Sequence, residues 1–508
     1  MDRRDFLTLF LSAAVACREQ SREETPSGDL VGASDRIGHK LRENPPSTAS
    51  RWETRDIVIV GAGIAGLSAG WRVRQKDFRD YVILELEPVA GGTSRSGSSK
   101  VSAFPWGAHY LPAPAPENRD LVQLLREMNI YDGDEIGEQF LCRDPEERVF
   151  FRGRWYEGLY LYAGATSEDL RQLQVFEQEV AKWVAWRDGR GRRAFTIPIA
   201  HGSDDAEVTA LDRISMEQWL DERKFTSSRL RWFIEYGCRD DYGTLLRDTS
   251  AWAGLFYFAS RVGKAGEESR PLITWPEGNG RLVAHLARGA NVMTNCLAVN
   301  IVGTDVIVNR GEEIFGIHAK KVIFAGPQFV AGRVISAWRE NPPPHLRQFT
   351  YGSWMVANIT LRDRPISNGF PLAWDNVLYE SPSLGYVVAT HQRGVDHGPT
   401  VFTYYYPLTD PRGRERLLAT SREQWAEVAL TDLRVAHPNL RALTERIDVM
   451  RWGHAMVRPR PEFMWSEARR RASQPFGDVH FAHSDLSGLA LFEEAFFHGL
   501  RAADEVLA

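Results

Sequence analysis

Cysteine is scarce in this chain of 508 residues, which holds four: Cys17, Cys142, Cys238 and Cys296. No two of them form a CxxC pair, so neither a zinc site nor a disulfide framework is expected, and no metal site is predicted. Neither sign of charge dominates, because 62 Lys and Arg stand against 67 Asp and Glu, which gives a formal net charge of −5. That balance provides no bulk attraction to nucleic acid, and a nucleic-acid partner is not expected.

Long hydrophobic runs are also missing. The longest apolar segments, such as residues 251–259, have the length of a core helix and are too short to span a bilayer. Apolar residues make up 43% of the chain and charged residues 25%, as in an ordinary globular protein. A chain of this length exceeds what one hydrophobic core supports, so two or three domains are expected.

The N-terminus combines Arg3 and Arg4 with a short apolar run at residues 9–16. This order resembles a twin-arginine export signal, and residues 1–17 are interpreted as one. The export machinery is then an expected partner, because that route carries proteins that have already folded around a cofactor. The mature protein is expected in the periplasm, or anchored on the outer side of the inner membrane.

Cys17 ends the sequence Ala14-Val15-Ala16-Cys17, which resembles a lipoprotein cleavage box. Such boxes usually carry Leu at the position of Ala14, so a lipid anchor at Cys17 and its absence stay equal alternatives. Residues 18–50 are rich in Glu, Ser, Pro, Gly and Arg and have few apolar side chains. They are predicted to be a flexible linker, because they cannot bury enough surface to order themselves.

A glycine-rich turn, Gly61-Ala62-Gly63-Ile64-Ala65-Gly66, begins directly after the apolar run 56–60. Gly61 permits a tight turn, Gly63 lets the backbone approach a pyrophosphate, and Gly66 lets a helix pack closely on the strand. The N–H groups of the first helical turn, which includes Ile64 and Ala65, would face the phosphates.

Glu85 follows a second strand-like run at residues 81–84. An acid at this distance from the glycine turn is placed to accept hydrogen bonds from a ribose hydroxyl. The strand, the turn, the helix, the second strand and the acid together predict a dinucleotide-binding βαβ unit.

A second glycine-rich loop follows at residues 88–97. Its adjacent Gly91 and Gly92 let the backbone come close to a ligand, and simple nicotinamide enzymes need no such loop here. The glycine turn, the acid and this loop resemble the flavin-containing amine oxidase superfamily, which also takes in phytoene desaturase-like enzymes. The resemblance implies an FAD cofactor, with Thr93 and Arg95 of the loop among its contacts.

Later segments resemble the same superfamily in the same order. Residues 104–110 resemble the segment beside the flavin ring, which would place Gly107 and Ala108 at the cofactor. Val299 matches a strand position whose backbone contacts adenine. Asp485 would contact the ribityl chain, and Phe492 opens the helix whose N-terminus faces the flavin, with Ser487 expected as the N-cap of that helix.

This resemblance covers about residue 51 to the C-terminus and implies an α/β plus α+β fold. A discontinuous Rossmann-like FAD-binding domain is expected at residues 51–119, 270–340 and 452–508. A substrate domain, built from a mixed sheet and helices, is expected at residues 120–269 and 341–451.

The chain departs from the superfamily in two respects. Some amine oxidases attach the flavin to a late cysteine, but no cysteine follows Cys296, so FAD is expected to be bound non-covalently. Many place a lysine on a strand of the substrate domain to hold a water near flavin N5, whereas the matching positions here are Val356 and Ala357. Either the chemistry does not use that water, or the alignment slips, or the substrate is not an amine.

Three residues are candidates for the active site: Trp452, which matches a region that walls the flavin, together with His454 and His109. In the aromatic run 402–406, only alternate members can share one wall, because neighbours on a strand face opposite ways. The acidic pairs Asp240-Asp241 and Glu493-Glu494 are expected to be surface or helix-end charges rather than a cation site.

Three functions remain open for a small-molecule substrate. The first is an exported FAD-dependent amine oxidase, with hydride transfer from a substrate C–H bond to flavin N5 and a polyamine-like substrate. The second is an FAD-dependent desaturase or dehydrogenase of an apolar substrate, which the missing lysine favours. The third is a flavoprotein with a structural or binding role. The electron acceptor is expected to be oxygen or a quinone.

Overall fold

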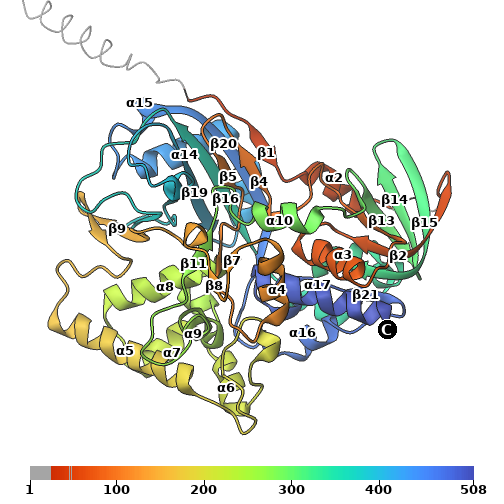
Figure 1. The fold of residues 1–508 in the computed structure, drawn as a ribbon, viewed down its shortest axis with the longest axis horizontal. Coiled ribbons are helices and arrows are strands. Elements are labelled where there is room, and N and C mark those ends of the chain that lie inside the picture. Colours follow the sequence, from red (N-terminus) through yellow and green to blue (C-terminus); the bar gives the residue numbers. More distant parts are fainter. Residues whose placement is uncertain (1–24, 45, 47) are drawn as a thin grey trace, which may run out of the picture.

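The computed structural model describes residues 25–44, 46 and 48–508 (Figure 1). The expected export signal at residues 1–17, with Cys17, lies outside the described residues, as does the first part of the expected linker. Within the described residues, we find no helix whose length and apolar character would let it cross a membrane.

The glycine turn belongs to a seven-stranded, largely parallel sheet at the right of Figure 1. Its strand order is β12-β3-β2-β15-β14-β13, and β21 pairs with β15. Its strands are β2 (Trp52–Val60), β3 (Tyr81–Leu84), β12 (Val292–Met293), β13 (Leu297–Val302), β14 (Asp305–Arg310), β15 (Glu313–Phe324) and β21 (Val479–Phe481). Strand β3 is a continuous apolar run and is buried throughout, as expected of a parallel strand covered on both faces of the sheet.

Helix α3 (Ile64–Gln75) follows the glycine turn and packs against both α10 (Gly280–Ala287) and the C-terminal helix α17 (Phe492–Leu507). A Cβ on Gly499 of α17 would lie 2.3 Å from the carbonyl oxygen of Ala65, so only glycine permits this close approach. The first and the last helix of the body are thereby joined over the same sheet, as the expected Rossmann-like fold requires.

A second, mixed sheet of eight strands has the order β1-β20-β16-β19-β18-β17-β9-β10. Its strands are β1 (Leu30–Gly32), β9 (Glu147–Phe151), β10 (Arg154–Glu157), β16 (Tyr351–Leu361), β17 (Asp375–Leu378), β18 (Tyr386–Val388), β19 (Thr400–Leu408) and β20 (Thr444–Val457). Helix α14 (Arg422–Leu433) packs on one face of this sheet through β16 and β20. The expected fold class, a Rossmann-like part with a mixed sheet and helices, is confirmed.

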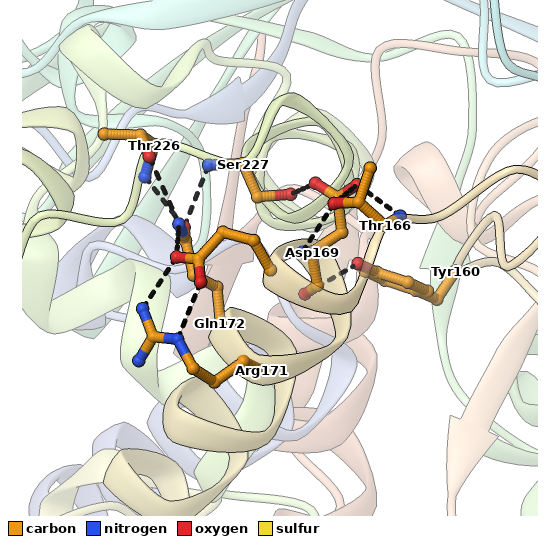
Figure 2. A network of polar contacts seen from close by, with 8 residues as sticks. Tyr160, Thr166, Asp169, Arg171, Gln172, Thr226 and Ser227 are labelled. Carbon is orange, nitrogen blue, oxygen red and sulfur yellow. Dashed lines mark hydrogen bonds and ion pairs between the residues drawn. The ribbon is translucent and has the colours of Figure 1, made fainter.

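A helical layer lies at the lower left of Figure 1, formed by α5 (Ser167–Ala185), α6 (Ala206–Ala210), α7 (Met216–Glu222), α8 (Ser228–Tyr242) and α9 (Ala251–Ala259). Figure 2 shows how α5 is fixed against the start of α8. Thr166 and Asp169 form a capping box, and the Gln172 side-chain oxygen accepts the backbone N–H groups of Thr226 and Ser227 at 2.8 and 2.9 Å. This network sets the position of the start of α5 relative to α8.

The segment expected to be a flexible linker is ordered where the structure describes it, which corrects that part of the prediction. Strand β1 pairs in parallel with β20, and α2 (Asp35–Gly38) and a 3₁₀ turn, η1 (His39–Arg42), follow. The Ser34 N–H and hydroxyl both donate to the Glu87 carboxylate, at 2.7 and 2.9 Å. The segment has no core of its own, and it gains its order from the open edge of β20.

The expected domain limits stay a prediction, but one strand crosses them. β20 runs through the limit expected at residue 452, while β9 and β10 join the second sheet from within the expected substrate domain.

Candidate cofactor and substrate site

The glycine turn after β2 has the geometry that a close phosphate contact needs. Gly61 has a φ of +105°, which side chains rarely adopt, and a Cβ on Gly66 would lie 1.8 Å from the Gly61 carbonyl oxygen. A Cβ on Gly63, in contrast, would meet no atom within 4 Å. Gly63 precedes the buried Ile64 and Ala65 of α3, and this helix start has no side-chain cap. Its N–H groups are therefore available to an anion.

The second glycine loop packs directly on the first. The Gly91 N–H donates to the Ala62 carbonyl at 2.8 Å, and a Cβ on Gly92 would meet only the Cα of Gly63, at 3.4 Å. Both glycines of the pair have positive φ, of +122° and +55°. The structure thus brings together the two loops that the sequence predicted as cofactor contacts, with open space beside Gly63.

Glu85 lies at the end of β3, as predicted, and its carboxylate holds both loops. One oxygen accepts the Ala62 N–H and the other the Glu87 N–H, each at 2.8 Å. Burial raises the pKa of Glu85, because the charged form is poorly solvated there, while the two backbone donors act in the opposite direction. The site therefore contains a buried acid that can accept further hydrogen bonds from a polar ligand.

Val299 lies at a bulge in β13, since Ala298 pairs with Val308 and Asn300 pairs with Ile307. The bulge removes Val299 from the ladder, and its carbonyl accepts the Arg339 guanidinium at 3.1 Å. Around Val299 lies a small apolar cluster of Leu297, Ile307, Leu41, Leu86 and Ile314. Leu41 comes from the N-terminal segment, so the part expected to be a linker contributes to the wall on this side of the site.

Two buried amides near the loops lack partners among the described residues. Asn279, at the entry to α10, has an unpaired side-chain oxygen, and both polar atoms of the Gln328 side chain are unpaired. Asn279 is 1% exposed and Gln328 is fully buried. Buried polar atoms of this kind are rarely left without a partner, so they fit a site built around a polar ligand. Neither amide was predicted as a cofactor contact from the sequence.

Asp485 and Ser487 have other contacts than expected. The Asp485 carboxylate accepts the backbone N–H of Gln328 at 2.9 Å and the hydroxyl of Tyr351, and it lies 3.0 Å from Nδ1 of His483. These donors lower its pKa against the effect of burial. Ser487 is not the N-cap of α17, which corrects that expectation: the N-cap is Leu491, four residues later, and the Ser487 hydroxyl donates to Glu494.

A cavity lies where the second glycine loop, the segment 104–110, the entry to α10, β20 and the start of α17 meet. The Ala108 peptide joins three of these parts, since its N–H donates to Thr93 and its carbonyl accepts the Asn279 N–H, each at 3.1 Å. Of the predicted site residues, the following line the cavity: Thr93, Gly107, Ala108, His109, Trp452 and Phe492.

Trp452 is held in place at the cavity wall. Its indole N–H donates to the Trp106 carbonyl at 2.7 Å, and the Arg95 guanidinium lies 5.4 Å from its ring centroid. Arg95 itself is buried and pairs with Glu87 at 3.3 Å. Through Glu87, Arg95 is also linked to the N-terminal segment at Ser34.

His454 does not line this cavity, which corrects its expected place beside Trp452. The ladder between β16 and β20 is irregular here, because Trp354 pairs with Trp452 while Gly352 pairs with Met456. The extra residues of β20 turn His454 toward Phe329, whose ring it stacks on at 4.1 Å, whereas Met456 returns to the cavity.

His109 is packed among aromatic rings, with centroids 5.0 Å from Tyr110, 5.3 Å from Trp374 and 4.9 Å from Tyr405. Burial lowers the pKa of His109 to about 4, so its ring is neutral at pH 7. Tyr405 faces the cavity while Tyr404 packs in the core behind β19, as the alternation of a strand predicts. These rings give the cavity a largely apolar, aromatic wall.

The Tyr405 hydroxyl donates to the Gly107 carbonyl at 2.8 Å and so fixes the segment beside the cavity. We expect Tyr405→Phe to lower the free energy of unfolding by about 1 kcal/mol, because a carbonyl loses its donor. Tyr406→Phe is the matched control, since its ring lies on the opposite face, near Trp425. Denaturant unfolding of the two variants checks this, and equal losses would contradict the anchoring role.

At the position where the superfamily often has a lysine, Val356 lines the cavity, and no lysine is among the described residues that line it. Instead, the cavity contains carboxylates. Asp240, Asp241 and Glu493 line it, and Asp241 pairs with Arg261 through two hydrogen bonds of 2.9 and 2.8 Å. These acids lie at helix ends, as expected, but they face the cavity and are not surface charges.

Glu493, like Asp240, lacks an ion pair among the described residues. It is 5% exposed. Burial raises its pKa to about 7, with the Asp241 charge acting in the same direction and Arg261 against it. The neighbouring Glu494 is also buried, but it accepts the Ile199 N–H at 2.8 Å and the Ser487 hydroxyl.

Glu493 should make stability depend on pH. The folded protein keeps a proton on this carboxyl that the unfolded chain loses near its ordinary pKa of 4.5. The stability that this bound proton contributes to the folded protein is therefore fully present below that value and is lost as the pH rises to about 7. From about pH 5 to about pH 8, we expect the free energy of unfolding of the native protein to fall by roughly 2 kcal/mol relative to that of Glu493→Gln.

Denaturant unfolding at both pH values measures this difference. Glu415→Gln serves as the control, because Glu415 is an exposed glutamate of α13 (Gly413–Ala419). A Glu493→Gln variant with the same pH dependence as the native protein would contradict the assignment.

Comparison with known proteins agrees with this geometry. Residues 59–128 match the family model of an NAD(P)-binding Rossmann-like domain. A curated relative from Mycobacterium tuberculosis (strain CDC 1551 / Oshkosh), named as a flavin-containing monoamine oxidase, AofH, is 24% identical over 500 residues, 92% of this chain and 98% of its own.

Solved structures share the fold over most of their length. A putrescine oxidase bound to putrescine superposes with a TM-score of 0.64 at 16% identity, covering 90% of this chain and 99% of its own. A fatty acid isomerase from P. acnes that produces CLA gives a TM-score of 0.63 at 15% identity, covering 89% and 98%. At such identities the likeness to these structures establishes the fold alone.

Proposed function

We propose that this protein is an FAD-dependent oxidoreductase of the flavin amine oxidase type. The observation that carries the proposal is a pair of stacked glycine loops held by a buried acid, the second of which reaches an aromatic cavity at the start of α17. When bound, FAD supplies the acceptor for a hydride from a substrate C–H bond, so the chain itself needs no catalytic acid or base.

The residues that would hold the cofactor follow from their positions. Gly63 and the N–H groups at the start of α3 suit the pyrophosphate, Glu85 suits the ribose, and Val299 suits the adenine. The unpaired amides of Asn279 and Gln328 offer further polar contacts. Non-covalent binding is supported by the absence of any described cysteine from the lining of the cavity.

The remaining residues of the cavity would bind and orient the substrate. Trp452, Tyr405 and Trp354 exclude water from it, and this dryness strengthens electrostatic interactions inside. The N–H groups at the start of α17, next to Phe492, favour negative charge. Glu493 and Asp240 could balance the positive charge of an amine, which supports the amine oxidase alternative.

The second candidate function is an FAD-dependent desaturase or dehydrogenase of an apolar substrate. It is supported by Val356, an apolar residue where a lysine is often found, and by the aromatic wall. If the protein is instead a flavoprotein with a mainly structural role, no donor is expected to reduce its flavin. The acceptor is proposed to be oxygen or a quinone.

Export before use is part of the proposal. It is supported by Arg3 and Arg4 ahead of the short apolar run, and it places the protein in the periplasm or on the outer side of the inner membrane. Under this proposal the exported protein either carries a lipid anchor at Cys17 or does not. Fractionation of cells that express the native chain, compared with Arg3→Lys and Arg4→Lys together, tests this proposal, and an unchanged location would contradict it.

Anaerobic reduction of the purified yellow protein distinguishes the functions. Bleaching of the flavin by amines supports an amine oxidase. Bleaching only by acyl or alkyl donors that can be desaturated supports the dehydrogenase. Peroxide release in air then identifies oxygen as the acceptor. A flavin that no donor in either panel bleaches would overturn both enzymatic alternatives.

A further inference from the structure

A second cavity adjoins the first on its outer side. Four residues line both cavities: Pro112, Ile197, Arg261 and Glu493. The outer cavity is built by the segment 112–121, by the loop after α5 and by the chain between α9 and β11 (Leu272–Thr274). A substrate that enters from this side meets the outer cavity before it reaches the aromatic wall.

The outer cavity is rich in positive charge, in contrast to the inner one. The guanidiniums of five arginines line it, against the carboxylates of Glu117 and Glu493: Arg187, Arg192, Arg193, Arg261 and Arg270. Two of the five are already neutralised, because Arg192 pairs with Asp188 and Asp204, and Arg261 pairs with Asp241.

The other three arginines have no carboxylate partner among the described residues. Arg187 donates only to the Val184 and Trp186 carbonyls, at 2.8 and 2.7 Å. Arg193 donates to the Val262 carbonyl at 2.6 Å, and its buried Nε has no partner. No ion pair of Arg270 occurs in the described part of the chain.

These like charges act on one another. Burial lowers the pKa of Arg193, and the charges of Arg187 and Arg270 lower it further, while Glu117 opposes the effect. Partly buried guanidiniums that repel each other, with donor atoms left free, are the arrangement that an anionic ligand relieves. A polycation would instead meet repulsion at this point.

Resting on the proposed function, we infer that the substrate carries an anionic group, a carboxylate or a phosphate, which the outer cavity holds through Arg193 and Arg270. The reacting end enters the inner cavity, where Asp240 and Glu493 suit an amine. The substrate class is therefore an amine with a remote anionic group, and the polyamine-like substrate expected from the sequence is disfavoured by the three unpaired guanidiniums.

Binding to the flavin-loaded protein, with its flavin first reduced by dithionite, tests this without turnover. The probes are octylamine, diaminooctane, aminooctanoate and aminohexyl phosphate, and the readout is the perturbation of the flavin spectrum under anaerobic conditions. We expect an amine that bears an anion to bind at least about tenfold more tightly than the diamine, because each such contact is a charge-assisted hydrogen bond. The carboxylate and phosphate probes show which anion the site prefers.

Arg193→Gln and Arg270→Gln should each remove most of this preference and leave octylamine binding unchanged. Arg190→Gln is the matched control, because Arg190 lies in the same loop, is exposed and does not line the cavity. Flavin content and the unfolding temperature verify that each variant folds.

The inference is overturned if the diamine binds as tightly as the anionic probes, if none of the anionic probes binds, or if Arg190→Gln has the same effect as the other two variants. In each of these cases the proposed function still stands if the protein contains flavin and amines bleach it. Absence of flavin defeats the proposed function instead.

Discussion

Gly63→Ala should abolish flavin binding while leaving the fold intact. Gly63 has φ and ψ of −70° and −176°, which alanine adopts freely, and its Cβ would meet no protein atom within 4 Å. The methyl group would instead occupy the space beside Gly92 into which the pyrophosphate is proposed to fit. We expect FAD affinity to fall by at least about 100-fold, and the stability of the apo-protein to change by less than about 1 kcal/mol.

Flavin absorbance after purification and reconstitution with added FAD measures the affinity, and denaturant unfolding of the apo-protein measures the stability. Gly189→Ala is the control, because a Cβ at Gly189 also meets no atom and Gly189 lies in the loop after α5, away from the glycine turn. Gly66→Ala should differ from both, since its Cβ would lie 1.8 Å from a backbone oxygen and the fold itself would suffer. Normal flavin content in Gly63→Ala would contradict the position of the pyrophosphate.

Glu85→Ala should cost both stability and cofactor. The Glu85 carboxylate accepts the N–H groups of Ala62 and Glu87, each at 2.8 Å, so its removal leaves two buried donors unpaired. We expect the free energy of unfolding to fall by about 2–4 kcal/mol, because each such donor costs about 1–2 kcal/mol. Flavin should be lost as well, since the same residue is proposed to hold the ribose.

Glu85→Gln separates the two effects. The amide keeps an acceptor oxygen for one loop N–H and can still bond to a hydroxyl, so about half of the lost stability should return. Denaturant unfolding and flavin content are measured on both variants. A Glu85→Ala protein with native stability and full flavin would show that Glu85 joins neither the loops nor the cofactor.

The sequence was sufficient for the parts of the site that are local in the chain. The glycine turn, Glu85 and the Gly91-Gly92 loop all lie within one short stretch of chain, and hydrogen bonds within that stretch join them. The spacing of these residues in the sequence therefore predicts that they lie together in the fold. The alternation along β19, which places Tyr405 but not Tyr404 at the cavity, is also a property of local backbone.

Tertiary contacts decided the rest. His454 turns away from the cavity because the ladder between β16 and β20 gains residues on one strand, which no local pattern reveals. The segment from Pro26 to Arg42 is ordered because β20 offers it an open edge, although its composition is that of a linker. Composition records what a segment can bury by itself, not the surface that the rest of the chain provides.

The buried acids illustrate the same limit. Asp240, Asp241 and Glu493 occur at helix ends, where exposure is the usual outcome, but the packing of α8 and α17 places all three on one cavity. The arginines of the outer cavity are likewise distant in sequence, since Arg193 follows α5 and Arg270 precedes β11. Charge patterns of this kind become visible only when the elements are assembled.

The cofactor content of the purified native protein tests the central claim most directly. The absorption spectrum and the nucleotide released by denaturation should show one FAD per chain, freed without proteolysis because it is held non-covalently. A protein that purifies without flavin and takes up none when FAD is added would contradict the account, as would a tightly bound nicotinamide dinucleotide in its place.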